Sequence, residues 1–536
     1  MTKPIWVPSP ERVEEANITR FMHGLRETRG LDVSDYTGLY HWSIEHPEDF
    51  WTAMWDFGDI IAETRGDTVL QHGDKMPGAR WFPDARLNFA ENLLRRRDGA
   101  EALVFRGEDK VRRSLTFVEL YEQVSRYAQA LRAAGVDRRD RVAAYMPNMP
   151  ETITAMLATT SIGAIWSSCS PDFGVRGVLD RFGQIEPKVL FAADGYFYNG
   201  KTFPLRDRLI EIVRELPTLE KVIIVPYASD ASDDLGIDKA TPLNDDFLTP
   251  HAPAEIRFER LPFNHPLYIL YSSGTTGAPK CIVHGAGGTL IQHMKEHLLH
   301  TDIKRGNRLF YFTTCGWMMW NWLASGLAAQ ATLLLYDGSP FYPDGNVLFD
   351  FADDTGMTVF GASAKYIDAV KKAGLVPRRS HDLSMVRAML STGSPLVPES
   401  FDFVYESVKE DILLASISGG TDLISCFMLG CPILPVYRGE IQCRGLGMRV
   451  EIFDEDGHAV RNQKGELVCT APFPSMPIGF WKDPEDRKYR AAYFEKYPGV
   501  WCHGDFVKLT PHDGIIMYGR SDSVLNPGGV RIGTAE

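Results

Sequence analysis

Cysteine is scarce in this chain, and its spacing matches no common pattern. Eight cysteines are scattered over 536 residues without a CxxC pair or the histidine spacing of a zinc module. This excludes a disulfide-stapled scaffold and a zinc ribbon. It predicts buried thiols in a reducing compartment, the cytoplasm.

Long basic runs and a secretory signal are also missing. The formal net charge is −13 and the pI is about 5.6, so the surface as a whole repels nucleic acid and anionic membranes. The first residues, Met1 to Trp6, lack the apolar core of a signal peptide. We therefore expect small molecules as partners, with neither nucleic acid nor membrane among them. The oligomeric state stays open, and a monomer is compatible with the sequence.

One stretch without charge, residues 309–336, is long enough to cross a bilayer. Threonine, asparagine, serine, glutamine and two glycines interrupt it, so we interpret it as a strand (309–312), a helix (318–329) and a strand (331–336). A membrane helix is the alternative.

The composition is that of a globular protein, with 44% hydrophobic and 24% charged residues. The first hundred residues are rich in aromatics and predict a helical cap. From residue 102, strands (103–106, 142–146) alternate with helices (117–134, 150–162), which predicts an α/β fold with mainly parallel sheets covered on both faces.

The most informative stretch is Tyr-Ser-Ser-Gly-Thr-Thr-Gly-Ala-Pro-Lys at residues 271–280, between two β-prone runs. Consecutive small residues let backbone N–H groups converge on an anion, and Lys280 adds a cation at the rim. A Walker loop is excluded, because two residues, not four, separate Gly274 from Gly277, and Cys281 follows the lysine. An ordinary surface loop is the alternative.

Further motifs follow in a fixed order. They are Ser-Thr-Gly-Ser-Pro-Leu (391–396), Ser-Ile-Ser-Gly-Gly-Thr-Asp (416–422), Trp-Cys-His-Gly-Asp (501–505), Gly-Arg-Ser-Asp (519–522) and Asn-Pro-Gly-Gly-Val-Arg-Ile-Gly (526–533). Together with the 271–280 loop they resemble the acyl-adenylate-forming superfamily, which includes the acyl-CoA synthetases. Residues 81–92 resemble the N-terminal signature of its acetyl-CoA-synthetase-type members.

The resemblance implies a site for ATP and Mg²⁺. It assigns catalytic roles to Lys280, Thr421, Asp422 and Arg531, with Asp422 as the metal ligand. It implies nucleotide contacts from Ser272, Ser273, Gly274, Thr275, Thr276, Gly277, Lys280, Gly393, Ser394, Pro395, Ser416, Ile417, Ser418, Gly419, Gly420, Thr421, Asp505, Arg520 and Arg531. Asp505 and Arg520 would bind the ribose.

The acyl group and coenzyme A complete the implied site. The acyl pocket would be lined by Trp317, Met318, Met319, Thr392 and Gly419, and coenzyme A would contact Lys201 and Gly528. Acetyl-CoA synthetases carry Trp-Trp-Gln where this chain has Ser-Gly-Gly at 418–420, so the loss of an indole at residue 419 predicts room for an acyl group larger than acetate.

Three stretches, Trp-Val-Pro-Ser-Pro-Glu-Arg-Val (6–13), Gly-Trp-Met-Met-Trp-Asn (316–321) and Ser-Gly-Gly-Thr-Asp (418–422), together resemble the branch of the superfamily that activates acetoacetate. The implied reaction forms acetoacetyl-AMP and pyrophosphate from ATP and then transfers the acyl group to coenzyme A, releasing AMP. A synthetase for butyrate or propionate and a silent nucleotide-binding relative are the alternatives. Asn321 and Ser418 are candidate donors to the 3-keto oxygen.

The same resemblance divides the chain into an acetyl-CoA-synthetase-type extension (1–100), AMP-binding α/β subdomains (101–435) and a β-rich subdomain (436–521). Asp522 would be the hinge, and residues 522–536 the stub of a C-terminal lid domain absent from this chain. Without a lid lysine, we expect ATP binding with poor turnover.

Overall fold

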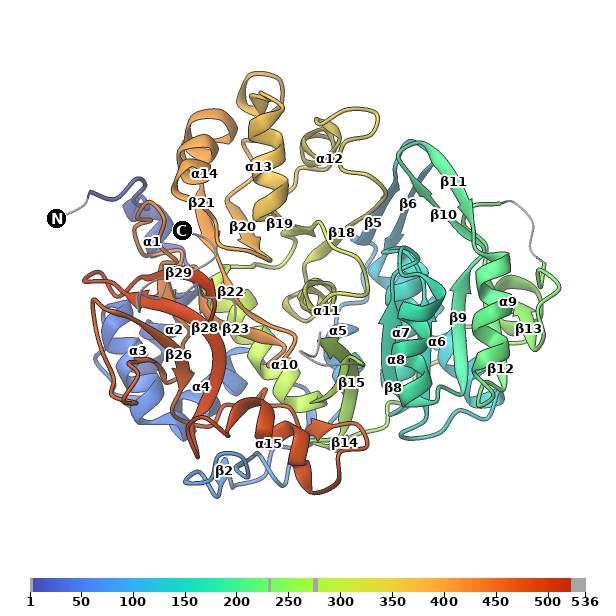
Figure 1. The fold of residues 1–536 in the computed structure, drawn as a ribbon, viewed down its shortest axis with the longest axis horizontal. Coiled ribbons are helices and arrows are strands. Elements are labelled where there is room, and N and C mark those ends of the chain that lie inside the picture. The colour runs from blue at the N-terminus through green and yellow to red at the C-terminus, as the bar shows by residue number, and fades with distance from the viewer. Residues whose placement is uncertain (1–2, 230–232, 273–277, 522–536) are drawn as a thin grey trace.

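The structure is a computed structural model that describes residues 3–229, 233–272 and 278–521 (Figure 1). The N-terminal part is a helical cap with short strands. Its elements are α1 (Pro10–Glu14), α2 (Asn17–Arg29), α3 (Tyr36–Glu45), α4 (Pro47–Phe57), β1 (Ala62–Thr64), β2 (Leu70–Gln71), β3 (Arg80–Trp81), β4 (Arg86–Leu87) and α5 (Phe89–Leu93). The cap's aromatic side chains belong to the same buried cluster as the two large sheets.

The first large sheet has eight strands in the order β13-β12-β9-β7-β8-β15-β16-β27. Their bounds are β7 (Arg141–Tyr145), β8 (Ile165–Cys169), β9 (Val189–Ala193), β12 (Lys221–Val225), β13 (Ala240–Pro242), β15 (Pro266–Ser272), β16 (Lys280–Gly285) and β27 (Gly479–Phe480). Helices α6 (Phe117–Ala133), α7 (Pro150–Ser161), α8 (Val175–Ile185) and α9 (Arg206–Glu215) pack around it, with the hairpin β10 (Gly195–Tyr198) and β11 (Lys201–Pro204) beside it (Figure 1).

Local sequence explains where these helices begin. The Thr116 side chain accepts from the Glu119 amide while Glu119 reaches back to the Thr116 amide, a capping box that starts α6. Pro150 occupies the first turn of α7, where its missing N–H costs nothing. The predicted helices at 117–134 and 150–162 are confirmed within one residue at each end.

The second large sheet has seven strands in the order β21-β20-β19-β17-β18-β5-β6. They are β5 (Glu101–Gly107), β6 (Val111–Thr116), β17 (Arg308–Tyr311), β18 (Thr332–Asp337), β19 (Val359–Ser363), β20 (Ala388–Thr392) and β21 (Leu413–Ser416). The associated helices are α11 (Met318–Ser325), α12 (Val347–Thr355), α13 (Ala364–Lys372) and α14 (Pro398–Phe403). Helix α10 (Ala286–Lys295) follows β16, packs against β15 and β16 of the first sheet and contacts α11.

The uncharged run at 309–336 is a buried β-α-β unit of this sheet. Strands β17 and β18 pair in parallel, with Leu309 opposite Leu333. Helix α11 lies between these strands in the sequence, and all of its residues are buried. The strand-helix-strand interpretation is therefore confirmed. No helix among the described ranges is long and apolar enough to cross a membrane.

Antiparallel strands make up the last part of the described chain. A three-stranded sheet contains β22 (Ser418–Gly420), β23 (Ser425–Leu429) and β24 (Cys443–Arg444), and a four-stranded sheet contains β25 (Val450–Phe453), β26 (Lys464–Cys469), β28 (Trp501–Leu509) and β29 (Ile515–Arg520). Antiparallel pairing thus begins at Ser418, before the predicted boundary at residue 436, and β27 returns to the first sheet.

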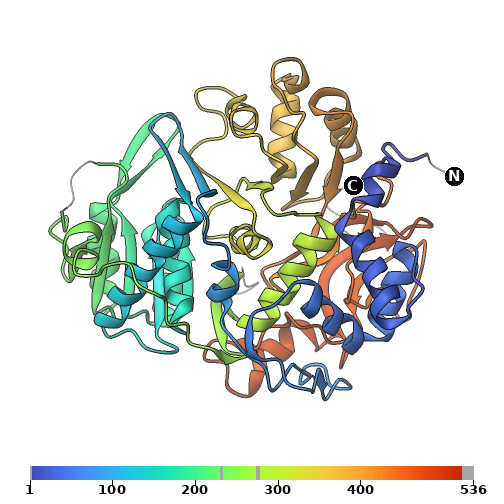
Figure 2. The ribbon, with the colours of Figure 1, turned by 180° about the vertical axis from the view of Figure 1, so that it is seen from behind.

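The three parts meet around the middle of the molecule. Seen from behind, the blue N-terminal helices lie beside the red β-rich part, and α10 and α11 run between the two large sheets (Figure 2). The Tyr40 hydroxyl donates to the Met448 carbonyl oxygen and the Gly447 amide donates to Ser43, so the cap holds the β-rich part directly.

Candidate active site

One cavity of about 720 Å³ lies where the second large sheet, the start of α11 and the β-rich part meet. Cavities of this size hold small-molecule ligands in proteins. The predicted residues that line it are Trp317, Met318, Met319, Thr392, Gly393, Ser394, Pro395, Ser416, Ile417, Ser418, Gly419, Gly420, Thr421, Asp505 and Arg520. Residues predicted for the nucleotide and for the acyl group therefore share one cavity.

One wall is the start of α11. Met318 and Met319 are buried, whereas Trp317, the N-cap residue, is 60% exposed at the cavity surface. Gly316 allows the chain to enter α11 closely against Phe173, because a Cβ at residue 316 would lie 2.8 Å from that ring.

Another wall is the β22–β23 hairpin. Here the structure corrects the prediction that the missing indole at residue 419 leaves room for a larger acyl group. A Cβ on Gly419 would lie 2.0 Å from the Ser425 carbonyl oxygen and 2.5 Å from the Cys426 Cα, both backbone atoms of β23. The glycine therefore allows close approach of two strands. On this backbone an indole does not fit at residue 419, so its absence alone does not set the size of the pocket.

Thr421 and Asp422 follow β22 and are held from outside the cavity. The ring Nε2 of His284 is 2.8 Å from the Thr421 carbonyl oxygen, and the Tyr493 hydroxyl donates to Asp422 Oδ1. The Lys280 ammonium lies 5.3 Å from the centre of the Tyr493 ring. The predicted cation and the predicted metal ligand thus share Tyr493 as a neighbour.

Asp505 and Arg520 face each other across β28 and β29. Arg520 donates to Asp505 Oδ1 at 3.3 Å, and His503 Nε2 is 3.6 Å from Asp505 Oδ2. Burial raises the pKa of the Asp505 carboxyl, while His503 and Arg520 oppose that rise. A buried carboxylate beside bound hydroxyl groups is a strong acceptor.

Glu296 contacts both walls from behind, and no motif in the sequence indicated this role. This carboxylate is 1% exposed. Its Oε1 accepts from the Ser425 hydroxyl and the Cys426 amide (3.0 Å), and its Oε2 accepts from the Trp322 indole (2.9 Å). It ties β23 to α11, and Lys295 lies 3.7 Å away as its counter-ion.

Acidification is expected to lower the free energy of unfolding through the buried His284. Burial lowers its pKa to about 3, against an ordinary 6.5. The unfolded chain therefore binds more protons between these values, and the free energy of unfolding falls as the pH falls below 6.5, by about 2 kcal/mol at pH 5 through this one group. Urea unfolding at pH 8 and pH 5 measures it.

A His284→Gln variant should lose this part of the acid sensitivity, whereas a variant of the exposed His458 to glutamine should keep it. An identical pH dependence in parent and His284→Gln proteins would contradict the assignment.

Five predicted residues of the described chain are not part of the cavity lining: Lys201, Ser272, Lys280, Asn321 and Asp422. Lys201 is exposed at the start of β11, in the hairpin beside the first sheet. Asn321, a candidate keto donor, is buried in α11 and does not line the cavity, whereas Ser418 does.

Ser272 pairs with Lys280 across β15 and β16, and its hydroxyl is buried without a hydrogen-bond partner in the described residues. The predictions for Ser273, Gly274, Thr275, Thr276, Gly277, Asp522, Gly528 and Arg531 lie outside the described residues.

Several lining or supporting residues were missed by the sequence interpretation. They are Tyr311, Ser363, Cys426, Ile441, Met517, His284, His503, Tyr493 and Glu296. His284 lies next to one of the sequence motifs and His503 lies inside another, so a search for polar residues in and beside the motifs could have found both. Tyr493 and Glu296 have no such signal, because they reach the site only through the fold.

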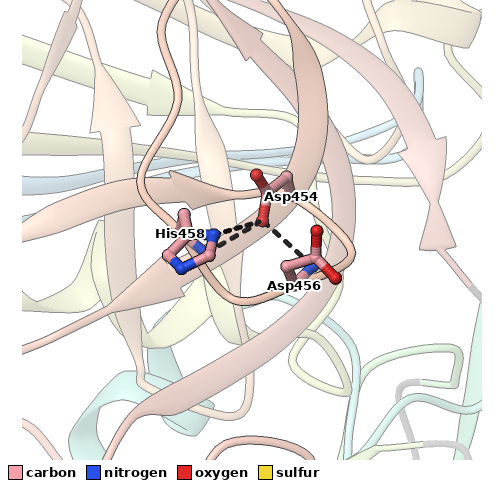
Figure 3. A group of neighbouring side chains, drawn as sticks. All are labelled: Asp454, Asp456 and His458. Atoms are coloured by element: carbon pink, nitrogen blue, oxygen red, sulfur yellow. Dashed lines mark hydrogen bonds and ion pairs between the residues drawn. The ribbon is translucent and has the colours of Figure 1, made fainter.

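A cluster of Asp454, Asp456 and His458 lies apart from this site, on the turn that follows β25 (Figure 3). Asp454 Oδ1 accepts from the backbone amides of Asp456 (3.0 Å) and His458 (2.9 Å). These are the bonds of an aspartate-capped turn, which explains the cluster without a metal.

Comparison with known proteins agrees with the geometry. Residues 89–477 match the family model described as AMP-binding enzyme, and residues 36–93 match the acetyl-coenzyme A synthetase N-terminus. Acetoacetyl-coenzyme A synthetase of Rhizobium meliloti is 59% identical over all of this chain and 82% of its own length. Acetoacetyl-CoA synthetase of Rattus norvegicus is 47% identical over 98% of this chain and 80% of its own length.

A relative with a different named substrate and a solved structure also match the chain. Malonamoyl-CoA synthetase of Penicillium aethiopicum is 42% identical over 96% of this chain and 74% of its own length. The solved acetoacetyl-CoA synthetase from Streptomyces lividans superposes with a TM-score of 0.94 at 44% identity, covering 99% of this chain and 82% of that one. The chain therefore belongs to the AMP-binding enzyme family. Within that family its place is among the acetoacetyl-CoA synthetases.

Proposed function

We propose that this protein activates acetoacetate with ATP and transfers the acyl group to coenzyme A. The carboxylate attacks the α-phosphate, which gives acetoacetyl-AMP and pyrophosphate, and the thiolate of coenzyme A then displaces AMP to give acetoacetyl-CoA. The single cavity that brings the α11 wall together with Thr421, Asp505 and Arg520 carries this proposal, because the acyl and nucleotide groups must meet in one place.

The names of the relatives narrow the choice of carboxylic acid substrate. Acetoacetate and the malonamate of the Penicillium relative both carry a carbonyl oxygen on C3, which butyrate and propionate lack. We infer that the acyl end of the cavity accepts a short acid with an oxygen at that position.

The chain's own groups would handle the charge of the reaction. Lys280 and Thr421 would hold the phosphates, and Asp505 with Arg520 would fix the ribose. Asp422 Oδ2 lies close to Gly420 of the cavity lining, since a Cβ added to that glycine would be 3.8 Å from it. One carboxylate beside nucleotide phosphates suits Mg²⁺, which would neutralise developing phosphate charge.

Coenzyme A is assigned to the surface that carries Lys201, with Gly528 as a second contact. An exposed ammonium at the start of β11 suits the 3′-phosphate. Asp522 would act as the hinge of a lid rotation between the two half-reactions. A reducing, cytoplasmic location is inferred from eight cysteines that form no disulfide, seven of them buried.

The test is the formation of AMP by the full-length protein in the presence of coenzyme A, with kcat/KM compared for acetate, propionate, butyrate and acetoacetate. We expect a preference for acetoacetate over butyrate of at least about tenfold, the effect of one good hydrogen bond. Equal use of butyrate would reject acetoacetate as the specific substrate and leave acyl adenylation standing. Absence of turnover together with nucleotide binding would favour a silent relative.

A further inference from the structure

Three residues of the cavity lining, Gly419, Cys426 and Tyr311, come from two parts of the chain, the β22–β23 hairpin and β17. Gly419 on β22 is the register partner of Cys426 on β23, and the Cys426 thiol is close enough to the Tyr311 phenol to influence its ionisation. Tyr311 and Cys426 both line the cavity, and each is 2% exposed.

The Tyr311 ring is fixed by its surroundings. Tyr311 ends β17 and pairs with Gly361 of β19, where a Cβ would lie 2.1 Å from the tyrosine ring. On another side the ring meets Trp322 of α11 edge-on, with the ring centres 6.2 Å apart and an angle of 75° between the planes. The glycine and the indole therefore hold the phenol at one place beside the α11 wall.

The phenol is a weakly engaged donor. Its hydroxyl donates to the Ala362 carbonyl oxygen at 3.4 Å, whereas O–H···O bonds are commonly about 2.5–3.0 Å long. Burial raises the pKa of Tyr311 well above its ordinary value, with a smaller contribution from Cys426, so the hydroxyl keeps its proton. An acceptor on a ligand would replace a poor bond with a good one.

We propose that Tyr311 is a specificity-determining residue whose hydroxyl donates to the C3 carbonyl oxygen of the acyl substrate. This rests on the proposed function and names the group that would recognise the acid. Among the other lining hydroxyls, Thr392 donates to the Ile417 carbonyl oxygen at 2.9 Å, which is a bond of ordinary length. The Thr314 hydroxyl also lines the cavity and is buried without a partner in the described residues, so Thr314→Val is a further variant to compare. Ser418 is the remaining competitor argued from the sequence.

A Tyr311→Phe variant tests the proposal, because phenylalanine keeps the ring against Gly361 and Trp322 and removes only the hydroxyl. The kcat/KM for acetoacetate is expected to fall about tenfold, mainly through KM, because the bond is made to a part of the substrate that does not react. The kcat/KM for butyrate should change by less than about twofold, since butyrate has no oxygen to lose contact with.

Tyr366→Phe is the matched control. Tyr366 is also buried, its hydroxyl has no partner in the described residues, and it does not line the cavity. This variant should leave the ratio of acetoacetate to butyrate unchanged. The ratio is measured within one preparation, so it does not depend on the fraction of folded enzyme.

The outcomes separate the two hypotheses. A parent protein that uses butyrate as well as acetoacetate rejects the proposed substrate. A selective parent whose Tyr311→Phe variant loses activity equally on both acids, or keeps its full preference, overturns the role of Tyr311. Loss of the preference in Ser418→Ala but not in Tyr311→Phe would give the role to Ser418.

Discussion

Replacing Asp505 with asparagine is expected to weaken ATP and AMP binding by about 100-fold. The carboxylate is buried beside Arg520 and His503 at the cavity wall, and it would accept from both ribose hydroxyls. Hydrogen bonds to a charged acceptor contribute about 1.5–3 kcal/mol each, so the loss of charge at two such bonds accounts for the effect. Asparagine keeps the volume, which limits the change to charge and bonding.

The measurement is the rise in melting temperature produced by ATP with Mg²⁺ in the parent and in Asp505→Asn, supported by calorimetric titration with AMP. Asp402→Asn is the matched control, because it breaks an aspartate–arginine pair with Arg438 on the surface, away from the cavity. An Asp505→Asn protein that binds AMP as tightly as the control would show that the ribose lies elsewhere.

Enlarging residue 419 is expected to destabilise the protein and to abolish turnover of every acid. Even the Cβ of Gly419→Ala would press on the Ser425 carbonyl oxygen, so β22 must separate from β23. Overpacking of this kind typically costs 1–3 kcal/mol, and we expect about 3 kcal/mol for alanine because both obstructing atoms are backbone. Gly419→Trp should therefore be inactive and gain no acetate activity.

Gly420→Ala provides the comparison. A Cβ at residue 420 meets nothing closer than 3.8 Å, so the free energy of unfolding should stay within about 0.5 kcal/mol of the parent value. Urea unfolding of the two alanine variants measures the difference. Equal stability of the two variants would mean that β22 can move away from β23 at little cost. A Gly419→Trp protein specific for acetate would show that the side chain at residue 419 does set the size of the acyl pocket.

Much of the site could be predicted because the information is local. The Ser-Gly-rich loop after one strand, the Thr-Asp pair after another and the Gly-Asp and Gly-Arg turns near the end each occupy a short stretch. These motifs occur in the order found in one family. Of their described residues, 392–395, 416–421, Asp505 and Arg520 line one cavity. The uncharged run was assigned correctly for the same reason, since interrupting polar residues and glycines are visible in one window.

The remaining contacts could not be predicted, because they depend on strand order. Glu296 meets Cys426 and Trp322 only because α10 ends behind the β22–β23 hairpin and beside α11. Tyr493 reaches Asp422 only because β27 returns the chain to β16 before α15 (Arg487–Tyr493) begins. No periodicity or spacing in the sequence encodes either meeting.

The sequence by itself determined the α/β class and the family, and it predicted the nucleotide residues, because strand alternation, helix caps and short motifs are encoded within a few neighbouring residues. The tertiary structure alone decided which way each residue faces. Gly419 was predicted to open space and instead permits two strands to touch, while Tyr311, which the sequence interpretation did not single out, lines the same cavity. The direction of a Cβ and the neighbours of a buried hydroxyl are set by the strand packed alongside, and that strand comes from another part of the chain.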